Sequence, residues 1–137
     1  MSKNYIVSGN IYRSTKGSAA YDIMMPDDII IKPDEVRLLE THVAVSIREG
    51  CFGQLTARSS LFQNTGCILL NSPAIIDSDY NGEEDSIKIH IKNMSNKSVE
   101  IKAGERLAQL VIIPFEKFTN EVEPTKERKG GLGSTGK

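Results

Sequence analysis

Apolar and polar residues alternate along several short segments of the chain. The segment SIKIHIK, residues 86–92, alternates strictly and places its three isoleucines on one face. This period of two is typical of a half-buried β-strand. The segment SVEIKAG at 98–104 repeats the pattern, and RLAQLVIIPF at 106–115 is apolar on both faces. We therefore predict strands in all three segments, with the last one buried on both sides.

Further β-rich segments lie earlier in the chain. Val36–Ile47 is partly alternating and long enough for one strand, while FGQLTA at 52–57 and GCILLN at 66–71 are short apolar segments. Turn-forming residues separate these segments every 8–12 positions, a spacing typical of a sandwich or barrel. No helical stripe exceeds two turns. The pattern predicts one all-β domain over residues 1–118.

The composition changes after Phe118. Residues 119–137, TNEVEPTKERKGGLGSTGK, are polar and charged and then rich in glycine. Such a segment buries too little apolar surface to order itself, so we predict a flexible C-terminal arm. Its GLGSTGK sequence begins like a phosphate-binding P-loop, but the Ser or Thr and the helix that complete a P-loop do not follow. The glycine-rich backbone N–H groups remain suited to binding anions.

Composition narrows the functional classes. The 137 residues carry a net charge of −1, so the chain lacks the basic footprint of a nucleic-acid-binding protein. No apolar stretch is long enough for a membrane span or signal peptide, which predicts a cytoplasmic protein, or a host-cell intracellular one if the source is a phage or virus. With two cysteines and two histidines, a zinc site is not expected.

The segment IIDSDYNGE at 75–83 is the strongest candidate for chemistry. From Asp77 onward it begins like a calcium-binding EF-hand loop, yet position twelve is Lys88 where that loop needs a bidentate glutamate. A strand pattern also follows where an EF-hand has a helix. Two interpretations remain: a turn built from good turn formers, or a tight turn that carries a catalytic carboxylate.

Five short segments, this one included, follow a recognisable order and spacing. In chain order they are AAYDI at 19–23, ARSSL at 57–61, NSPAIIDSDYNGE at 71–83, GERLAQL at 104–110 and RKGGLGSTG at 128–136. Together they resemble the five motifs of the trimeric deoxyuridine triphosphatases, or dUTPases. The resemblance implies a jelly-roll-like β-barrel with a flexible C-terminal arm and a homotrimer whose active sites are shared. Motifs one, two and four would come from one subunit, motif three from a second and the arm from a third.

The resemblance also implies a reaction. The substrate would be dUTP, and an activated water would attack its α-phosphorus to give dUMP and pyrophosphate. This activity limits uracil in DNA and supplies dUMP for thymidylate synthesis. Asp77 matches the family's water-activating aspartate, and such a base typically contributes 10²–10⁴-fold. The cofactor would be Mg²⁺, bound mainly through the triphosphate and without direct protein ligands.

Nucleoside recognition would use motif three and the arm. Tyr80 matches the residue whose ring excludes a 2′-hydroxyl. The uracil would be bound by Asn71 and by backbone groups around Ala74 and Ile76, which supply both a donor and an acceptor. Leu132 stands where the family has an aromatic residue over the base, a stack worth about 1–3 kcal/mol in nucleic-acid-binding proteins.

The remaining motif residues would contact the phosphates or each other. The expected phosphate-binding residues are Arg58, Ser59, Ser60, Gln109, Arg128, Gly133, Ser134 and Thr135. Asp22 and Arg106 would either hold neighbouring motifs together or order metal-bound water. Asp79 is expected to stabilise the turn. Other departures from the family pattern are Ala20, Ser60 and Pro73-Ala74, where the motifs have Gly, Gly and Ala-Gly.

Three alternatives compete with this interpretation. A dCTP deaminase-like enzyme has a catalytic glutamate on the strand after motif three, whereas SIKIHIKN contains no carboxylate. A non-catalytic nucleotide-gated regulatory module of the same fold would not need the retained Asp77, Tyr80 and Arg128. A structural capsid-like β protein would explain the strands and none of the motifs. A dUTP diphosphatase accounts for the most residues.

Overall fold

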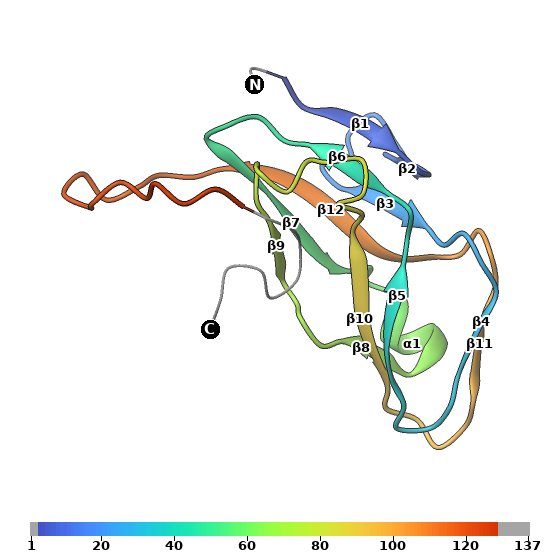
Figure 1. Cartoon of the computed structure of the whole chain (residues 1–137). Helices are drawn as coiled ribbons and strands as arrows, with labels where there is room; N and C mark the ends of the chain where they lie inside the picture. The colour runs from blue at the N-terminus through green and yellow to red at the C-terminus, as the bar shows by residue number, and fades with distance from the viewer. Residues whose placement is uncertain (1–2, 129–137) are drawn as a thin grey trace.

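The computed structural model describes residues 3–128 of the 137-residue chain. Within that range the regular secondary structure is almost all β-strand, with one short helix (Figure 1). The elements are β1 Tyr5–Ser8, β2 Ile11–Tyr12, β3 Tyr21–Met24, β4 Ile29–Ile31, β5 Val36–Glu40, β6 Ala44–Ser46, β7 Cys51–Ala57, α1 Leu61–Thr65, β8 Cys67–Leu69, β9 Ala74–Ile76, β10 Lys88–Asn93, β11 Val99–Ile101 and β12 Arg106–Pro114.

The largest sheet has five strands in the order β2-β3-β12-β7-β9. β12 lies in its centre and pairs antiparallel with β3 and with β7, but Gln109 and Val111–Ile113 are only half-buried, so the predicted burial on both sides is wrong for this part of the strand. Leu107, Ala108 and Leu110 are buried along it. The edge strand β9, which lies within motif three, pairs with β7, so motif three forms one edge of the main sheet.

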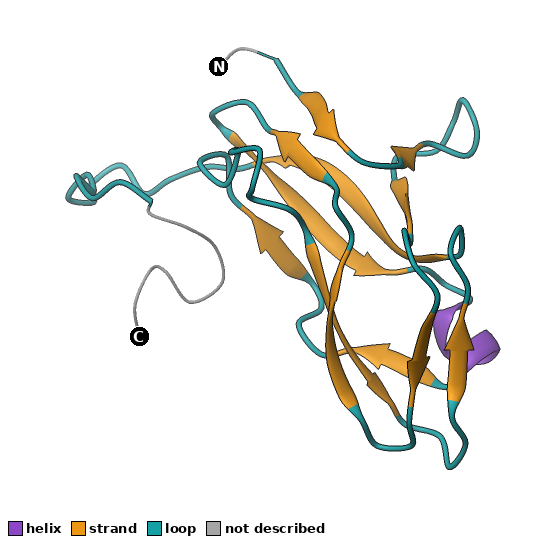
Figure 2. Ribbon diagram, turned by 45° about the vertical axis from the view of Figure 1, so that its right-hand side comes forward, coloured by secondary structure: helices purple, strands orange, loops and turns teal. Residues whose placement is uncertain are grey.

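The other strands form smaller antiparallel sheets that share the same core. β10 lies between β5 and β8, and its residues alternate between buried and half-buried positions as their period of two predicts. Ile89 and Ile91 are fully buried on it. Two further pairs, β1 with β6 and β11 with β4, complete the described strands (Figure 2). The predicted all-β class is confirmed.

One further local prediction was wrong. Val36–Ile47 is not one strand, because the Thr41 hydroxyl donates to the Ile87 carbonyl at 2.5 Å and accepts from the Val43 amide at 3.0 Å. His42 between them takes a positive φ of 57°, which ends the extended backbone and separates β5 from β6. The short helix α1 was also not predicted; it ends at Gly66, whose φ of 74° suits a helix C-terminus.

The chain leaves the strands after β12. Residues 115–128 contain no helix or strand; they project from the sheets and then return toward the end of β9, as the orange-to-red trace in Figure 1 shows. Phe118 and Val122 on this excursion are 83% and 92% exposed. Residues 129–137 lie outside the described range, so the domain boundary at 118/119 and the predicted flexibility of the arm remain predictions. Within residues 3–128, no helix is both long and apolar enough to cross a membrane.

Candidate active site

Motif three forms a tight turn directly after β9. The Tyr80 amide donates to the Asp77 carbonyl at 3.1 Å, which closes the turn. The β7–β9 ladder fixes where the turn lies, because Gly53 of β7 is opposite Ile76, the last residue of β9. A Cβ atom at Gly53 would lie 2.9 Å from methyl carbons of both Ile47 and Leu110, so a larger residue here would require these core side chains to shift. The turn therefore places Asp77 at one end of the main sheet.

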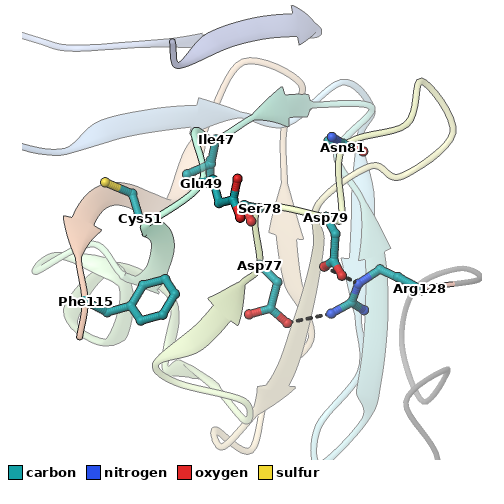
Figure 3. Close-up of a pocket in the computed structure, with 9 residues that line it drawn as sticks. All are labelled: Ile47, Glu49, Cys51, Asp77, Ser78, Asp79, Asn81, Phe115 and Arg128. Carbon is teal, nitrogen blue, oxygen red and sulfur yellow. Dashed lines mark hydrogen bonds and ion pairs between the residues drawn. The ribbon is translucent and has the colours of Figure 1, made fainter. Parts of the chain in front are cut away.

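Arg128 binds both aspartates of the turn (Figure 3). Its Nη2 donates to Asp77 Oδ2 at 2.5 Å, and its Nε donates to Asp79 Oδ1 at 2.8 Å. The guanidinium carbon also lies 5.8 Å from the centre of the Tyr80 ring, which is within the range of a cation–π contact. The hydrogen bond to Asp79 is the largest of the effects that raise the pKa of Arg128. The arm is thus attached to motif three of the same chain.

A cavity of about 470 Å³ opens beside these groups. Asp77, Asp79 and Arg128 line it together with Glu49 of the loop before β7. The side chains of Asp77 and Asp79 are 52% and 61% exposed, whereas that of Arg128 is only 13% exposed. The proposed base therefore borders open space, and the arginine is the enclosed member of the group.

A second cavity, of about 290 Å³, contains the predicted nucleoside-binding residues. Asn71, Ala74, Ile76 and Tyr80 all line it. Ala74 and Ile76 lie on β9, while Asn71 precedes this strand and Tyr80 follows it. The structure thus brings together the expected uracil and deoxyribose contacts among residues 3–128; Leu132 lies outside the described residues.

The Tyr80 ring is held at both ends. Its hydroxyl donates to the Ser86 carbonyl at 2.5 Å, and the main-chain turn with Asp77 holds its backbone. Burial raises the pKa of the phenol, so the hydroxyl remains a donor at neutral pH. The ring cannot rotate out of the cavity without losing that hydrogen bond. A fixed flat ring is what a steric gate requires.

Motifs one, two and four meet at a different place. Asp22 on β3 pairs with Arg58 Nε at 3.5 Å and with Arg106 Nη1 at 3.1 Å, one carboxylate oxygen to each. Arg58 also donates to the Arg106 carbonyl at 3.1 Å. The Asp22 side chain is only 7% exposed, so the two guanidinium groups supply the charge that a buried carboxylate needs. Of the two predicted roles for Asp22, this pairing supports the one that holds motifs together.

The remaining phosphate-binding candidates lie around this cluster. Arg58, Ser60 and Arg106 line a cavity of about 400 Å³. Ser59 is exposed beside them, and Gln109, farther along β12, donates to the Thr56 hydroxyl at 3.4 Å. Gly133, Ser134 and Thr135 lie outside the described residues.

One chain does not bring the two groups of motifs together. In the antiparallel β7–β9 ladder, Asp77 follows the pair Gly53–Ile76, while Arg58 lies beyond the pair Leu55–Ala74 at the opposite end. At about 3.3 Å per residue, the five residues from Gly53 to Arg58 span roughly 17 Å. That distance is longer than a triphosphate. Asp77 and Arg58 of one chain therefore lie far apart along the main sheet.

Two contacts of the site were not predicted from the sequence. Asp79 was expected to stabilise the turn, yet its carboxylate accepts from Arg128, which is far away in the chain. The Ser86 carbonyl that holds Tyr80 is a backbone group, and no side-chain pattern identifies it. Among residues 3–128, no three His, Cys, Asp or Glu side chains are grouped closely enough to hold a metal ion.

Comparison with known proteins now identifies the family. The dUTPase family model matches residues 9–136, which include all five motif segments. The deoxyuridine 5′-triphosphate nucleotidohydrolase of Hydrogenobaculum sp. is 40% identical over 130 residues, covering 91% of this chain and 88% of that protein. The corresponding protein of Nautilia profundicola is 42% identical over 127 residues, covering 90% and 87%.

Comparison with solved structures points to the same family. The crystal structure of dUTPase from Streptococcus mutans matches with a TM-score of 0.76 and 32% identity, covering 80% of this chain and 88% of that one. A variant dUTPase from phage phi11 of S. aureus, described for its coordination of a structural Mg(II) ion, has a TM-score of 0.74 and 27% identity and covers 91% and 97%. The chain belongs to the dUTPase family. The predicted family, the dUTPase-type fold and the dUTP-hydrolysing enzyme class are confirmed.

Proposed function

We propose that this protein is a dUTP diphosphatase that converts dUTP to dUMP and pyrophosphate. The observation that carries the proposal is the family match over residues 9–136, which spans all five motif segments. The structure adds support, because the candidate base and the candidate nucleoside contacts border neighbouring cavities at one end of the main sheet. The activity would limit uracil in DNA and supply dUMP for thymidylate synthesis.

The chemistry assigned to Asp77 is general base catalysis. Its carboxylate takes a proton from water, the water oxygen forms a bond to the α-phosphorus, and the bond from that phosphorus to the α–β bridging oxygen breaks. Pyrophosphate leaves with the bonding electron pair, and dUMP retains the new oxygen. The exposed side of Asp77 borders open space, so a water molecule has access to it. A base in this position typically contributes 10²–10⁴-fold to the rate.

Recognition of the nucleoside follows from the second cavity. Extended backbone at Ala74–Ile76 presents N–H and C=O groups side by side, which matches the acceptor O4 and the donor N3–H of uracil. Cytosine has the opposite pattern and would leave buried polar groups unpaired. The Tyr80 ring would lie against C2′ and exclude a 2′-hydroxyl. Leu132, at the position of the family's aromatic residue, would cover the base.

Phosphate binding is assigned to the cluster on Asp22 and to the arm. Arg58, with Ser59, Ser60 and Gln109, would contact the triphosphate, and Arg128 with the GSTG segment would contact its γ-phosphate. The residues present fit a magnesium ion held chiefly by the triphosphate, since Asp22 is already paired with two guanidinium groups and the Asp77 and Asp79 carboxylates with a third. When bound, Mg²⁺ neutralises charge on the phosphates.

The separation of the motif groups supports a homotrimer with shared sites. Asp77 and Arg58 of one chain lie at opposite ends of the β7–β9 ladder, so a complete site needs Arg58 from another copy. The family resemblance supplies the arrangement: motifs one, two and four from one subunit, motif three from a second and the arm from a third. Three copies around a closed three-fold axis give three such sites.

A substrate panel tests the function. We expect the protein with Mg²⁺ to release pyrophosphate and dUMP from dUTP, and to leave dATP, dCTP, dGTP and dTTP unchanged. Nucleotide products and ammonia are measured by chromatography and an enzymatic assay. Ammonia from dCTP would identify a deaminase. Nucleotide binding with no product of either kind would identify the non-catalytic regulatory module.

Subunit complementation tests the shared site. An Asp77→Asn chain and a chain truncated before Arg128 should each be inactive alone. After equal amounts exchange subunits, about one quarter of the sites combine an intact Asp77 with an intact arm from a different chain, so activity should reappear. Steady-state dUTP hydrolysis after exchange is the measurement.

The matched control for that mixture carries Asp77→Asn on both chains, one of them also truncated. This mixture exchanges in the same way and has no intact base, so it should remain inactive. A mixture of the single variants that stays inactive after confirmed exchange would contradict the three-chain site. So would a light-scattering mass near the 15.1 kDa of one chain instead of about three times that value.

A further inference from the structure

Arg128 contacts two groups that the proposed function uses for catalysis and recognition. Its guanidinium binds Asp77 at 2.5 Å and Asp79 at 2.8 Å and lies 5.8 Å from the centre of the Tyr80 ring. Under the proposed function, the first of these residues is the base and the last is the sugar gate. The same arginine, which would bind phosphate during turnover, therefore occupies both groups when no nucleotide is present.

We infer that Asp79 is a positioning residue that holds Arg128 on motif three of its own chain until a triphosphate displaces it. The inference rests on the proposed function for the roles of Asp77 and Arg128. It assigns Asp79 the task of binding the arm, in place of the turn-stabilising role predicted from the sequence. The resting position of the arginine is then within one chain, and its working position is on the substrate.

Geometry assigns this task to Asp79. The Arg128 Nε–H points sideways from the side chain, on the same edge of the guanidinium as Nη2, and its acceptor is Asp79 Oδ1 at 2.8 Å. The two aspartates are separated by one residue on a turn closed by the Tyr80 amide, so their carboxylates face the same guanidinium (Figure 3). Two charge-assisted hydrogen bonds with different acceptors fix the plane of an arginine as well as its position.

The exposures of Arg128, Asp77 and Asp79 fit a guanidinium that exchanges the two carboxylates for the phosphate of a substrate. Arg128 is 13% exposed and its two acceptors are 52% and 61% exposed, so water and an incoming anion can approach the carboxylates from the cavity. Ion pairs open to solvent stabilise only weakly, so a γ-phosphate with bidentate acceptors can replace this one. Release of Arg128 then frees the second carboxylate oxygen of Asp77, Oδ2, and the face of the Tyr80 ring that the guanidinium covers.

Chemical labelling of arginine tests the resting contact without any turnover. Phenylglyoxal is added to the full chain in the absence of nucleotide, and mass spectrometry follows the labelling of Arg128 and of the exposed Arg48 in the same sample. We expect Arg128 to react several-fold more slowly than Arg48 in the unmodified protein. Asp79→Asn should raise the Arg128 rate toward that of Arg48, and Asp79→Glu, which keeps the charge, should restore slow labelling.

Glu123→Gln is the matched control. Glu123 is another carboxylate of the arm region, paired with Lys117 at 3.6 Å and far from the motif-three turn in the chain. Its removal should leave the labelling of Arg128 unchanged. Should Asp79→Asn fail to fold, raising the ionic strength of the unmodified protein gives the same information, because salt weakens exposed pairs and should accelerate labelling of Arg128 relative to Arg48.

Ligand affinity supplies the second readout. A non-hydrolysable dUTP analogue competes with Asp79 for Arg128, whereas dUMP has no γ-phosphate to do so. Asp79→Asn should therefore tighten binding of the analogue by about two- to fivefold and leave the affinity for dUMP unchanged. Equal labelling of Arg128 and Arg48 in the unmodified protein, or analogue affinity that Asp79→Asn weakens, would overturn the inference. Neither result depends on hydrolysis of dUTP, whose absence would overturn only the proposed function.

Discussion

Asp77→Asn is expected to lower kcat for dUTP by about 10²–10⁴-fold while the protein still binds nucleotide. The asparagine side chain has nearly the same shape but accepts no proton at neutral pH. It also removes one of the two charges that bind Arg128, so a non-hydrolysable analogue should bind at least as tightly as before. Single-turnover rates and titration with the analogue separate the two effects.

The control for this variant lies in the same loop. Glu83 is an exposed carboxylate six residues after Asp77, and Glu83→Gln removes an equal charge near the site. Its kcat should remain within about twofold of the unmodified value, as expected for a residue that takes no part in proton transfer. Retention of more than about a tenth of kcat by Asp77→Asn would mean that another group activates the water.

The strands were predictable wherever one local period governs them. β10 alternates because one of its faces is buried, and β12 contributes Leu107, Ala108 and Leu110 to the core. Prediction failed where a long-range contact overrides local pattern. The Thr41 hydroxyl binds a carbonyl 46 residues away and divides one apparent strand into two. Residues 36–47 alone do not indicate that Thr41 binds the Ile87 carbonyl.

The candidate site shows the same limit. Motif matching was sufficient to name Asp77, Tyr80 and Arg128, since each motif is a contiguous segment whose residue types are visible in the sequence. It did not indicate that Arg128 would bind Asp79, because a charge pair between segments about 50 residues apart leaves no periodic signal. The family resemblance did imply that Arg58 and Asp77 act from different subunits, and the register of β7 and β9 agrees by placing them at opposite ends of the ladder.

Tyr80→Ala is expected to admit UTP and to reduce the preference for dUTP over UTP by about 10–200-fold, the range for one misfitting group in a binding pocket. The physical reason is steric. The ring is held in the cavity by the hydrogen bond from its hydroxyl to the Ser86 carbonyl, and in this position it would exclude a 2′-hydroxyl. Values of kcat/KM for dUTP and UTP, measured with the same enzyme preparation, give the ratio independently of any loss of folded protein.

Tyr80→Phe distinguishes the contribution of the ring from that of the hydrogen bond made by its hydroxyl. Phenylalanine keeps the steric surface and loses only the hydrogen bond to Ser86, so it should retain most of the discrimination that alanine loses. An intermediate loss in Tyr80→Phe would show that the gate depends on the rigidity of the ring as well as on its size. An unchanged ratio in Tyr80→Ala would remove Tyr80 from the gate, and the 2′-position would then have to be sensed by the backbone of the turn that follows β9.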